Sequence, residues 1–384
     1  MAMKIYHTLA LDLQPWVLRA VDKMRRSFLS MQSDCVKGSI WLERNRAECS
    51  KNSLVLAKAV VQKIRAHCYE WKNVGNTGSK LHHLPLQYLK DITNNFCAEW
   101  ILGTGGFGVV YEGVLQNGKS IAVKKLLQAK PISLRQFENE VNLLMNLKHP
   151  NIVRLVGYCY ETQHLPMLHE GKIFFDWITE SLLCLECLPN GSLYKHISGA
   201  SSGLDWATRW KIIEGISYGL QCLHEQSKNP ILHLDLKPAN ILLDENMLPK
   251  ITDFGLSRLI DQEQTIYTTN MVGTLGYMPP EYLWRIITSK SDIFSFGVII
   301  MEIITGQRDY PEDIKASSHD FIDHELQEWR NRLQKEPGYA SLESDCRRIE
   351  RCIQIGLICV NPERTKRPTM KKIIDMLEGL ESMN

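Results

Sequence analysis

A glycine-rich stretch between two apolar, strand-like runs constrains the fold of this chain more than any other feature. Glycines occupy positions 103, 105 and 108 of the segment GTGGFGVV. A backbone without Cβ atoms can approach a phosphate chain closely and turn its N–H groups toward it. A dinucleotide-binding βαβ unit uses the same glycine spacing, but it requires a helix after the glycines. Here residues 109–111 continue as strand toward a turn at Asn117-Gly118, so the dinucleotide alternative is disfavoured.

A lysine and a glutamate follow the glycine-rich stretch at positions that suggest an ion pair. Lys124 ends the apolar run 121–124, which we expect to form a third strand. A helix is predicted over 133–147, because apolar residues recur there at helical spacing: Leu134, Phe137, Val141, Leu144 and Leu147. Glu140 lies near the centre of this apolar stripe. A carboxylate on a buried face needs a partner, and Lys124 is the candidate.

The second half of the chain combines long helical patterns with short polar motifs. The segment HLDLKPAN (233–240) precedes a strand-like run at 241–243, and the tripeptide DFG follows at 253–255. The segment GTLGYMPPE occupies 273–281, and helical patterns dominate from residue 204 onward. A β-rich part followed by a helix-rich part predicts two lobes with a cleft between them.

Taken in this order, these blocks resemble the signature set of protein kinases. The segments FGVVYEG, NIVRLVGYCYE, LPNGSL, LKPANILLD, GTLGYMPPEY and DIFSFGVIIMEIITG look most like the plant receptor-like kinases. The resemblance covers about residues 85–380. It implies an α+β fold with a small five-stranded lobe, one key helix in that lobe, a larger helical lobe and ATP in the cleft. The implied activity is transfer of the ATP γ-phosphate to Ser or Thr of proteins, assisted by Mg²⁺.

The resemblance also assigns roles to individual residues. Asp235 is expected to accept the proton of the substrate hydroxyl, and Lys237 to neutralise charge on the transferring phosphate. Glu140 would orient Lys124, which holds the α- and β-phosphates. Metal ligands are expected at Asn240 and Asp253. The expected ATP-binding residues lie in the glycine-rich hairpin, the third strand and the hinge between the lobes: Leu102, Gly103, Thr104, Gly105, Gly106, Phe107, Gly108, Val110, Ala122, Lys124, Glu186 and Leu188.

Further positions match structural parts of the family pattern. Leu185 would guard the pocket behind adenine, and Thr274 resembles the threonine that positions the substrate. An ion pair is expected between Glu281 and Arg367. Asp292, at the start of a buried apolar helix, is interpreted as structural rather than catalytic.

The chain departs from the family pattern at three places. Leu234 replaces the Arg that precedes the catalytic Asp in many kinases, and Pro279 replaces the Ala of the A-P-E motif. An insert at 161–181 falls where two strands of the small lobe join. We expect this insert to form a projecting hairpin or loop. None of the three departures removes a catalytic group.

The N-terminal part of the chain is basic and carries no chemical motif. Residues 1–90 hold 15 Lys and Arg against 6 Asp and Glu. Two helical patterns predict either a packed helical hairpin or a basic amphipathic surface for acidic lipid or a receptor. The predicted organisation is a helical segment at 1–80, a linker at 81–95 and a kinase domain at 96–381, with its lobes at about 96–186 and 187–381. Nucleic acid is not expected among the partners.

Composition and cysteine usage indicate the compartment. Hydrophobic residues make up 44% and charged residues 23%, which excludes collagenous, largely disordered and disulfide-scaffold proteins. The 11 cysteines are irregularly spaced and are interpreted as free thiols in a reducing compartment; Cys184 and Cys187 lack the second pair that a zinc site would need. Neither a signal peptide nor a membrane span is predicted. The expected location is cytoplasmic, and peripheral association with the plasma membrane is the alternative.

A nucleotide-binding pseudokinase scaffold is the alternative from a different functional class. It predicts the loss of at least one of four residues, and all four are present: Lys124, Asp235, Asn240 and Asp253. An adaptor that docks through its basic N-terminus complements the enzyme hypothesis rather than opposing it.

Overall fold

The computed structural model describes residues 82–381, except for 107, 128–130, 170–171, 198–202, 228, 260–265, 268–272, 309–313 and 336–339. The helical patterns predicted within 1–80 therefore lie outside the described residues, as does Phe107 of the glycine-rich stretch.

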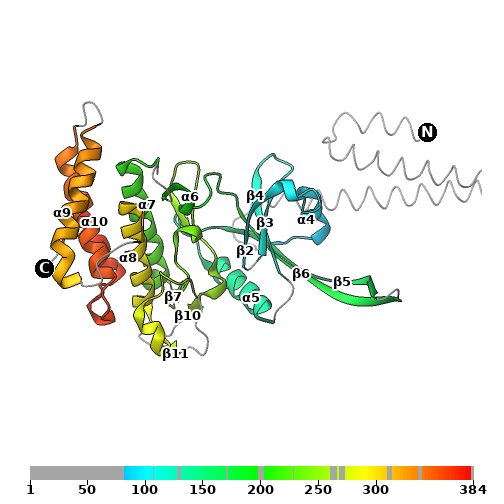
Figure 1. Cartoon of the computed structure of the whole chain (residues 1–384). Helices are drawn as coiled ribbons and strands as arrows, with labels where there is room; N and C mark the ends of the chain where they lie inside the picture. The colour runs from blue at the N-terminus through cyan, green and yellow to red at the C-terminus, as the bar shows by residue number, and fades with distance from the viewer. Residues whose placement is uncertain are drawn as a thin grey trace, which may run out of the picture. The chain divides into compact units, whose positions relative to one another are not determined.

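An antiparallel sheet forms the first lobe (Figure 1). Its order is β1-β5-β6-β4-β3-β2, so the five predicted strands are present and the two-residue strand β1 is added at one edge. The strands are β1 (His82–His83), β2 (Ile101–Gly105), β3 (Gly108–Val114), β4 (Ser120–Leu126), β5 (Leu155–His169) and β6 (Lys172–Glu186). The single long helix of this lobe is α5 (Pro131–Asn146), which confirms the helix predicted at 133–147.

The segment 81–95 differs from the linker that the sequence predicts. It contains strand β1 and helix α4 (Leu86–Ile92), which is followed by a short turn of 3₁₀-helix at Ala98–Trp100. Its apolar residues are buried in the described structure: Leu84, Leu86, Tyr88, Leu89 and Ile92. Because burial of these side chains stabilises the segment by about 1.5–3 kcal/mol each at most, it packs as part of the small lobe rather than as a spacer.

The insert at 161–181 forms the projecting hairpin that the sequence predicts. Strands β5 and β6 pair continuously from Gly157↔Cys184 to His169↔Lys172, whereas β4 leaves β6 after Lys125↔Leu182. In Figure 1 the two strands extend beyond the rest of the sheet. Trp177 and Leu168 are 68% and 74% exposed, so this hairpin carries apolar side chains outside the core of the lobe.

The second lobe is mainly helical. Its helices are α6 (Tyr194–Ile197), α7 (Trp206–Gln221), α8 (Ser289–Thr305), α9 (Ile314–Leu333), α10 (Leu342–Cys359) and α11 (Met370–Glu378). Three small antiparallel strand pairs accompany them: β7 (Ile231–Leu232) with β10 (Arg258–Leu259), β8 (Ile241–Leu243) with β9 (Pro249–Ile251), and β11 (Ile266–Tyr267) with β12 (Ile286–Ile287). The strand predicted at 241–243 is β8.

Helix α8 is the central support of this lobe. It begins at a capping box, in which Thr288 and Ser291 satisfy each other's backbone N–H groups, and it ends at Gly306 with φ of 77°. Nearly its whole length is buried. Asp292 in its first turn accepts hydrogen bonds from the backbone N–H groups of His233 (2.8 Å) and Leu234 (2.9 Å). The structural role predicted for Asp292 is therefore confirmed, because it ties the loop after β7 to the helical core.

The predicted ion pair between Glu281 and Arg367 is also present. The guanidinium donates to both carboxylate oxygens, at 2.7 and 2.8 Å, and the Arg367 side chain is fully buried. Such a two-point contact fixes orientation as well as distance. It joins the segment after Gly273 to the C-terminal part of the lobe.

Candidate active site

The glycine-rich hairpin joins β2 to β3, with Gly105 opposite Gly108. A side chain at Gly108 would overlap the carbonyl oxygen of Lys125 on β4, so the close approach of these strands requires glycine there. At Gly103 and Gly105 a Cβ atom would meet open space instead. The backbone of β2 is therefore exposed at these two glycines.

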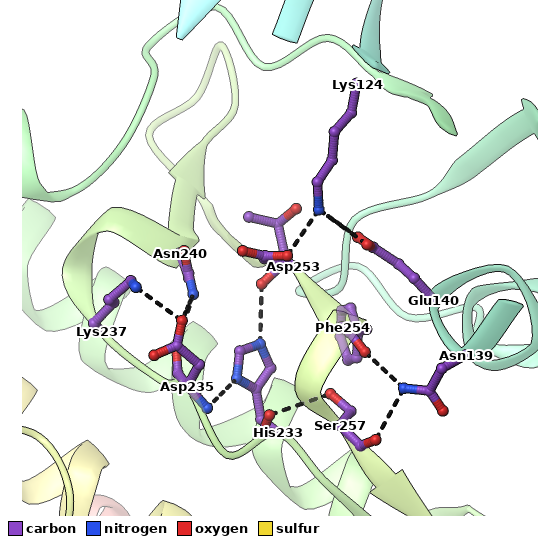
Figure 2. Close-up of polar contacts among 11 residues, drawn as sticks. Lys124, Asn139, Glu140, His233, Asp235, Lys237, Asn240, Asp253, Phe254 and Ser257 are labelled. Atoms are coloured by element: carbon purple, nitrogen blue, oxygen red, sulfur yellow. Dashed lines mark hydrogen bonds and ion pairs between the residues drawn. The ribbon is translucent and has the colours of Figure 1, made fainter. Parts of the chain in front are cut away.

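Lys124 on β4 lies between two carboxylates (Figure 2). Its Nζ is 2.9 Å from Oε2 of Glu140 on α5 and 2.7 Å from Oδ1 of Asp253. The Lys124 and Glu140 side chains are 11% and 2% exposed. Burial alone would lower the pKa of Lys124, but the attraction of the two carboxylates raises it above its ordinary value, so the ammonium is charged at neutral pH. The pairing of Lys124 with Glu140, predicted from the apolar stripe, is confirmed.

Asp253 reaches Lys124 from a strained backbone position. Its φ is 69°, in the left-handed region that few residues other than glycine adopt. Burial opposes ionisation of its carboxyl, but Lys124 lowers the pKa of Asp253 below the ordinary range. The next residue, Phe254, is buried against the ring of His233, with centroids 5.2 Å apart. This packing holds the left-handed turn in place.

Helix α5 contacts the same segment through a residue that the sequence did not single out. Asn139 donates from Nδ2 to the carbonyl oxygens of Phe254 (3.0 Å) and Ser257 (2.9 Å). Figure 2 shows these two bonds beside the pair of Glu140 with Lys124. An asparagine one position before a predicted functional glutamate gives no sequence signal of its own, because its partners lie more than 100 residues away.

A second group of polar side chains surrounds Asp235, which is 5% exposed. Its Oδ1 accepts a hydrogen bond from Thr274 (2.6 Å), and its Oδ2 accepts from Lys237 (2.8 Å) and Asn240 (3.1 Å). Lys237 also donates to Thr274 Oγ1 (2.7 Å). The predicted Asp, Lys and Asn are therefore brought together, and the threonine predicted to position the substrate joins them.

His233 connects the two groups. Its Nε2–H donates to the carbonyl oxygen of Thr252 (2.9 Å), and its Nδ1 accepts from the backbone N–H of Asp235 (3.3 Å). The backbone N–H of Thr252 in turn donates to the carbonyl oxygen of Asn240 (3.0 Å). Because Thr252 precedes Asp253, these bonds set the loop that carries Asp235 against the segment that carries Asp253.

The hinge between the lobes begins where β6 ends. Leu185 is 5% exposed and lies opposite Ala122 on β4, and Leu188 packs against the buried core. Glu186 is held on both sides: its N–H donates to the carbonyl oxygen of Arg154, and its Oε1 accepts from Lys250 (3.1 Å). Of the predicted ATP-binding residues, Gly103, Val110 and Lys124 are neighbours across β2, β3 and β4.

This arrangement can bind a phosphate chain and transfer a proton. The ammonium of Lys124 lies on a strand that pairs with the glycine-rich hairpin, and the carboxylates of Asp235 and Asp253 and the amide of Asn240 complete the group. Carboxylate and amide oxygens suit hard divalent cations, whereas an ammonium and backbone N–H groups suit phosphate oxygens. A two-lobed fold with these groups at the junction of the lobes defines a phosphotransferase site of the protein kinase type.

Comparisons with known proteins agree with this geometry. The protein kinase domain family matches residues 96–377, so the chain belongs to the protein kinase family. It is 40% identical over 321 residues to cysteine-rich receptor-like protein kinase 26 of Arabidopsis thaliana, a match that covers 81% of this chain and 45% of that relative. A G-type lectin S-receptor-like serine/threonine-protein kinase of the same plant is 40% identical over 301 residues, covering 76% of this chain and 35% of the relative. The chain thus spans less than half the length of these relatives.

Within the part of the chain that the structure describes, no helix combines the length and the apolar character needed to cross a bilayer.

Proposed function

We propose that the chain is an ATP-dependent serine/threonine protein kinase that acts in receptor-linked signalling. The contact of Lys124 with both Glu140 and Asp253 supports the proposal, because a cation suited to phosphate oxygens there lies beside a carboxylate suited to a divalent metal. Similarity to relatives named as receptor-like serine/threonine-protein kinases supports the substrate class. The predicted domain limits, 96–381, are part of the same proposal.

In this proposal each polar group has one task. Asp235 accepts the proton of the substrate hydroxyl as its oxygen attacks the γ-phosphorus, and Lys237, 2.8 Å away, offsets charge on the transferred phosphoryl group. Thr274 orients the Asp235 carboxylate through its Oδ1. Lys124 holds the α- and β-phosphates. The backbone of Glu186 and Leu188 receives adenine, next to the side chains of Leu102, Val110 and Ala122.

Asn240 and Asp253 fit a magnesium ion. The amide nitrogen of Asn240 donates to Asp235, so its amide oxygen is the atom that remains to bind a cation. Lys124 contacts Oδ1 of Asp253, and the second carboxylate oxygen is the corresponding donor. An ion held by these two residues would supply positive charge that offsets the negative charge of the phosphates.

The experiment that tests the function is a phosphotransfer assay with Mg·ATP and a generic protein substrate. The parent should transfer phosphate, whereas Asp253→Asn should lose at least about a hundredfold in kcat/KM at ordinary magnesium concentrations, or about 2.7 kcal/mol. Part of this activity should return as magnesium is raised. Asp320→Asn, an exposed carboxylate on α9, is the matched control and should behave as the parent. Full activity of Asp253→Asn at ordinary magnesium would contradict the metal assignment, and an inactive parent that binds ATP would support the pseudokinase scaffold.

Activity should not depend on a phosphate that pairs with the residue before Asp235. Leu234 is 5% exposed and packs with Leu232, Tyr282 and Ile287. It offers no charge to a phosphorylated activation segment, and the contact that it lacks is worth about 1.5–3 kcal/mol in kinases that use it. Lys250 and Arg258 are the candidate substitutes for the missing Arg: Lys250 is paired with Glu186, whereas Arg258 on β10 is exposed, so the substitution test below also decides whether Arg258 serves. Strand β11 of the segment pairs instead through its backbone with β12.

To measure this independence, Thr265, Thr268 and Thr269 are replaced by Ala and Tyr267 by Phe in one variant. We expect phosphate transfer to an exogenous substrate to stay within about tenfold of the parent, which is about 1.4 kcal/mol. Thr274 is left in place because it contacts Asp235. A fall of about a hundredfold or more would show that the phosphates of this segment control activity.

Residues 1–80 lie outside the described structure, so their docking on acidic membrane or on a receptor remains a prediction, as does the cytoplasmic location.

A further inference from the structure

Three potential metal ligands converge at the edge of the sheet, away from the residues assigned to catalysis. They are His83 on β1 and Cys159 and Glu161 on β5, and one ligand atom from each lies within 4.8 Å of the other two. Among the described residues this is the one group of three His, Cys or acidic side chains with that spacing. Cys159 and Glu161 are two positions apart on a strand, so they share a face of the sheet. His83 is exposed and Cys159 is fully buried, so the group runs from the surface into the lobe.

Two glutamates lie opposite each other beside this group, and a lysine pairs with one of them. Glu161 lies directly opposite Glu180 across β5 and β6, and like charges in that position destabilise a sheet. Lys125 pairs with Oε1 of Glu180 at 2.9 Å. The second oxygen of Glu180, Oε2, is buried and has no hydrogen-bond partner among the described residues. A buried carboxylate oxygen without a partner costs stability, and a nearby cation would reduce that cost.

Glu161 is already held in one orientation. Its Oε1 accepts a hydrogen bond from the backbone N–H of Leu86 at 2.9 Å. A carboxylate can accept such a bond with one oxygen while the other binds a metal, and metal-binding carboxylates commonly do so. Cys159, fully buried on the same face of the strand, offers a thiol that zinc would bind as the thiolate, with its proton released to solvent.

We propose that His83, Cys159 and Glu161 bind a zinc ion at the base of the β5–β6 hairpin. An imidazole nitrogen, a thiolate sulfur and a carboxylate oxygen are the donors that zinc takes in proteins. The thiolate disfavours magnesium and calcium, which require oxygen ligands. The two charges of the ion balance the thiolate and the Glu161 carboxylate. With three protein ligands, water would take the fourth tetrahedral position.

The ion would add a link between segments that strand pairing and the contact of the His83 ring with Tyr158 already join. Besides the bond from Leu86 to Glu161, the described backbone contacts between the start of the lobe and β5 include the bond from the N–H of Leu84 to the carbonyl oxygen of Tyr158 at 2.7 Å. Zinc binding would therefore anchor β1 and α4 to the strand that continues into the insert. Because zinc would bind the folded chain and not the unfolded chain, it should raise the unfolding temperature of the protein.

Cobalt(II) substitution in the full-length protein, stripped of metal, tests the proposal directly. Cobalt should give a thiolate-to-metal charge-transfer band that zinc abolishes. The band should be absent in Cys159→Ser and unchanged in Cys97→Ser, a matched control with a partly exposed free thiol in the same lobe. His83→Gln and Glu161→Gln should each weaken zinc binding by about tenfold to a hundredfold.

Substitution of His83, the exposed ligand, separates loss of the metal from misfolding. Cys159 is in the core, so its substitution can disturb packing, whereas His83 is at the surface and His83→Gln should leave the fold unchanged. Zinc should raise the unfolding temperature of the parent and of Cys97→Ser, and not that of His83→Gln. A cobalt band that survives in Cys159→Ser, or zinc affinity in His83→Gln equal to that of the parent, would overturn the proposal.

Discussion

Replacing Asp235 by Asn should reduce kcat by about a thousandfold, or about 4 kcal/mol of transition-state stabilisation. The two carboxylate oxygens of Asp235 accept hydrogen bonds from Thr274, Lys237 and Asn240. The side chain of Asn has the same shape as that of Asp, but an NH2 donor replaces one of the two acceptor oxygens. The amide therefore cannot take the proton of the substrate hydroxyl. Since the side-chain hydrogen bonds of Asp235 in the described structure go to Thr274, Lys237 and Asn240 and not to the residues proposed to hold adenine, the affinity for ATP should change little.

Two quantities are measured for each variant: the kinetics of phosphate transfer, and the rise in unfolding temperature that ATP causes. Asp320→Asn, which changes an exposed carboxylate in the same way, should match the parent in both. Loss of ATP-induced stabilisation in Asp235→Asn would mean that the substitution disturbs the cleft as a whole. Turnover within about tenfold of the parent would exclude Asp235 as the proton acceptor.

Replacing Lys124 by Met should reduce kcat/KM by about a hundredfold to a thousandfold. The substitution removes the cation that lies between Glu140 and Asp253 while keeping most of the side-chain volume. It also leaves Glu140 buried without its partner, so the free energy of unfolding should fall by about 1–3 kcal/mol. Lys125→Met is a matched control, because the neighbouring lysine points to the opposite face and contacts Glu180 instead.

A double variant separates catalysis from stability at this site. In Lys124→Met with Glu140→Gln the more deeply buried of the two unpaired charges is absent, so denaturant unfolding should return part of the way to the parent value. Phosphotransfer should stay as low as in the single variant, because the phosphate-binding cation is still missing. Activity of Lys124→Met equal to that of Lys125→Met would contradict the proposed role of Lys124.

Local patterns were sufficient to predict much of this molecule. Side-chain periodicity and glycine geometry account for three features. These are the strand that continues after Gly108, the position of Glu140 on the apolar face of α5 and the hairpin at the insert. The grouping of Asp235, Lys237 and Asn240 also follows, because a loop between short strands holds residues so near in sequence together.

Contacts between distant segments were decided by the tertiary structure alone. The bond from Lys124 to Asp253 spans 129 positions, and Asn139 reaches Phe254 across 115. Neither separation leaves a periodic trace, because each depends on how β4 and α5 of the first lobe pack against the second lobe. The segment 81–95 is so short that its apolar residues do not indicate whether it forms a packed helix or a linker. Only its contacts with β3 and β5 decide this. The convergence of His83, Cys159 and Glu161 depends likewise on where β1 meets β5, and strand pairing at a sheet edge is set by the assembled lobe rather than by either strand.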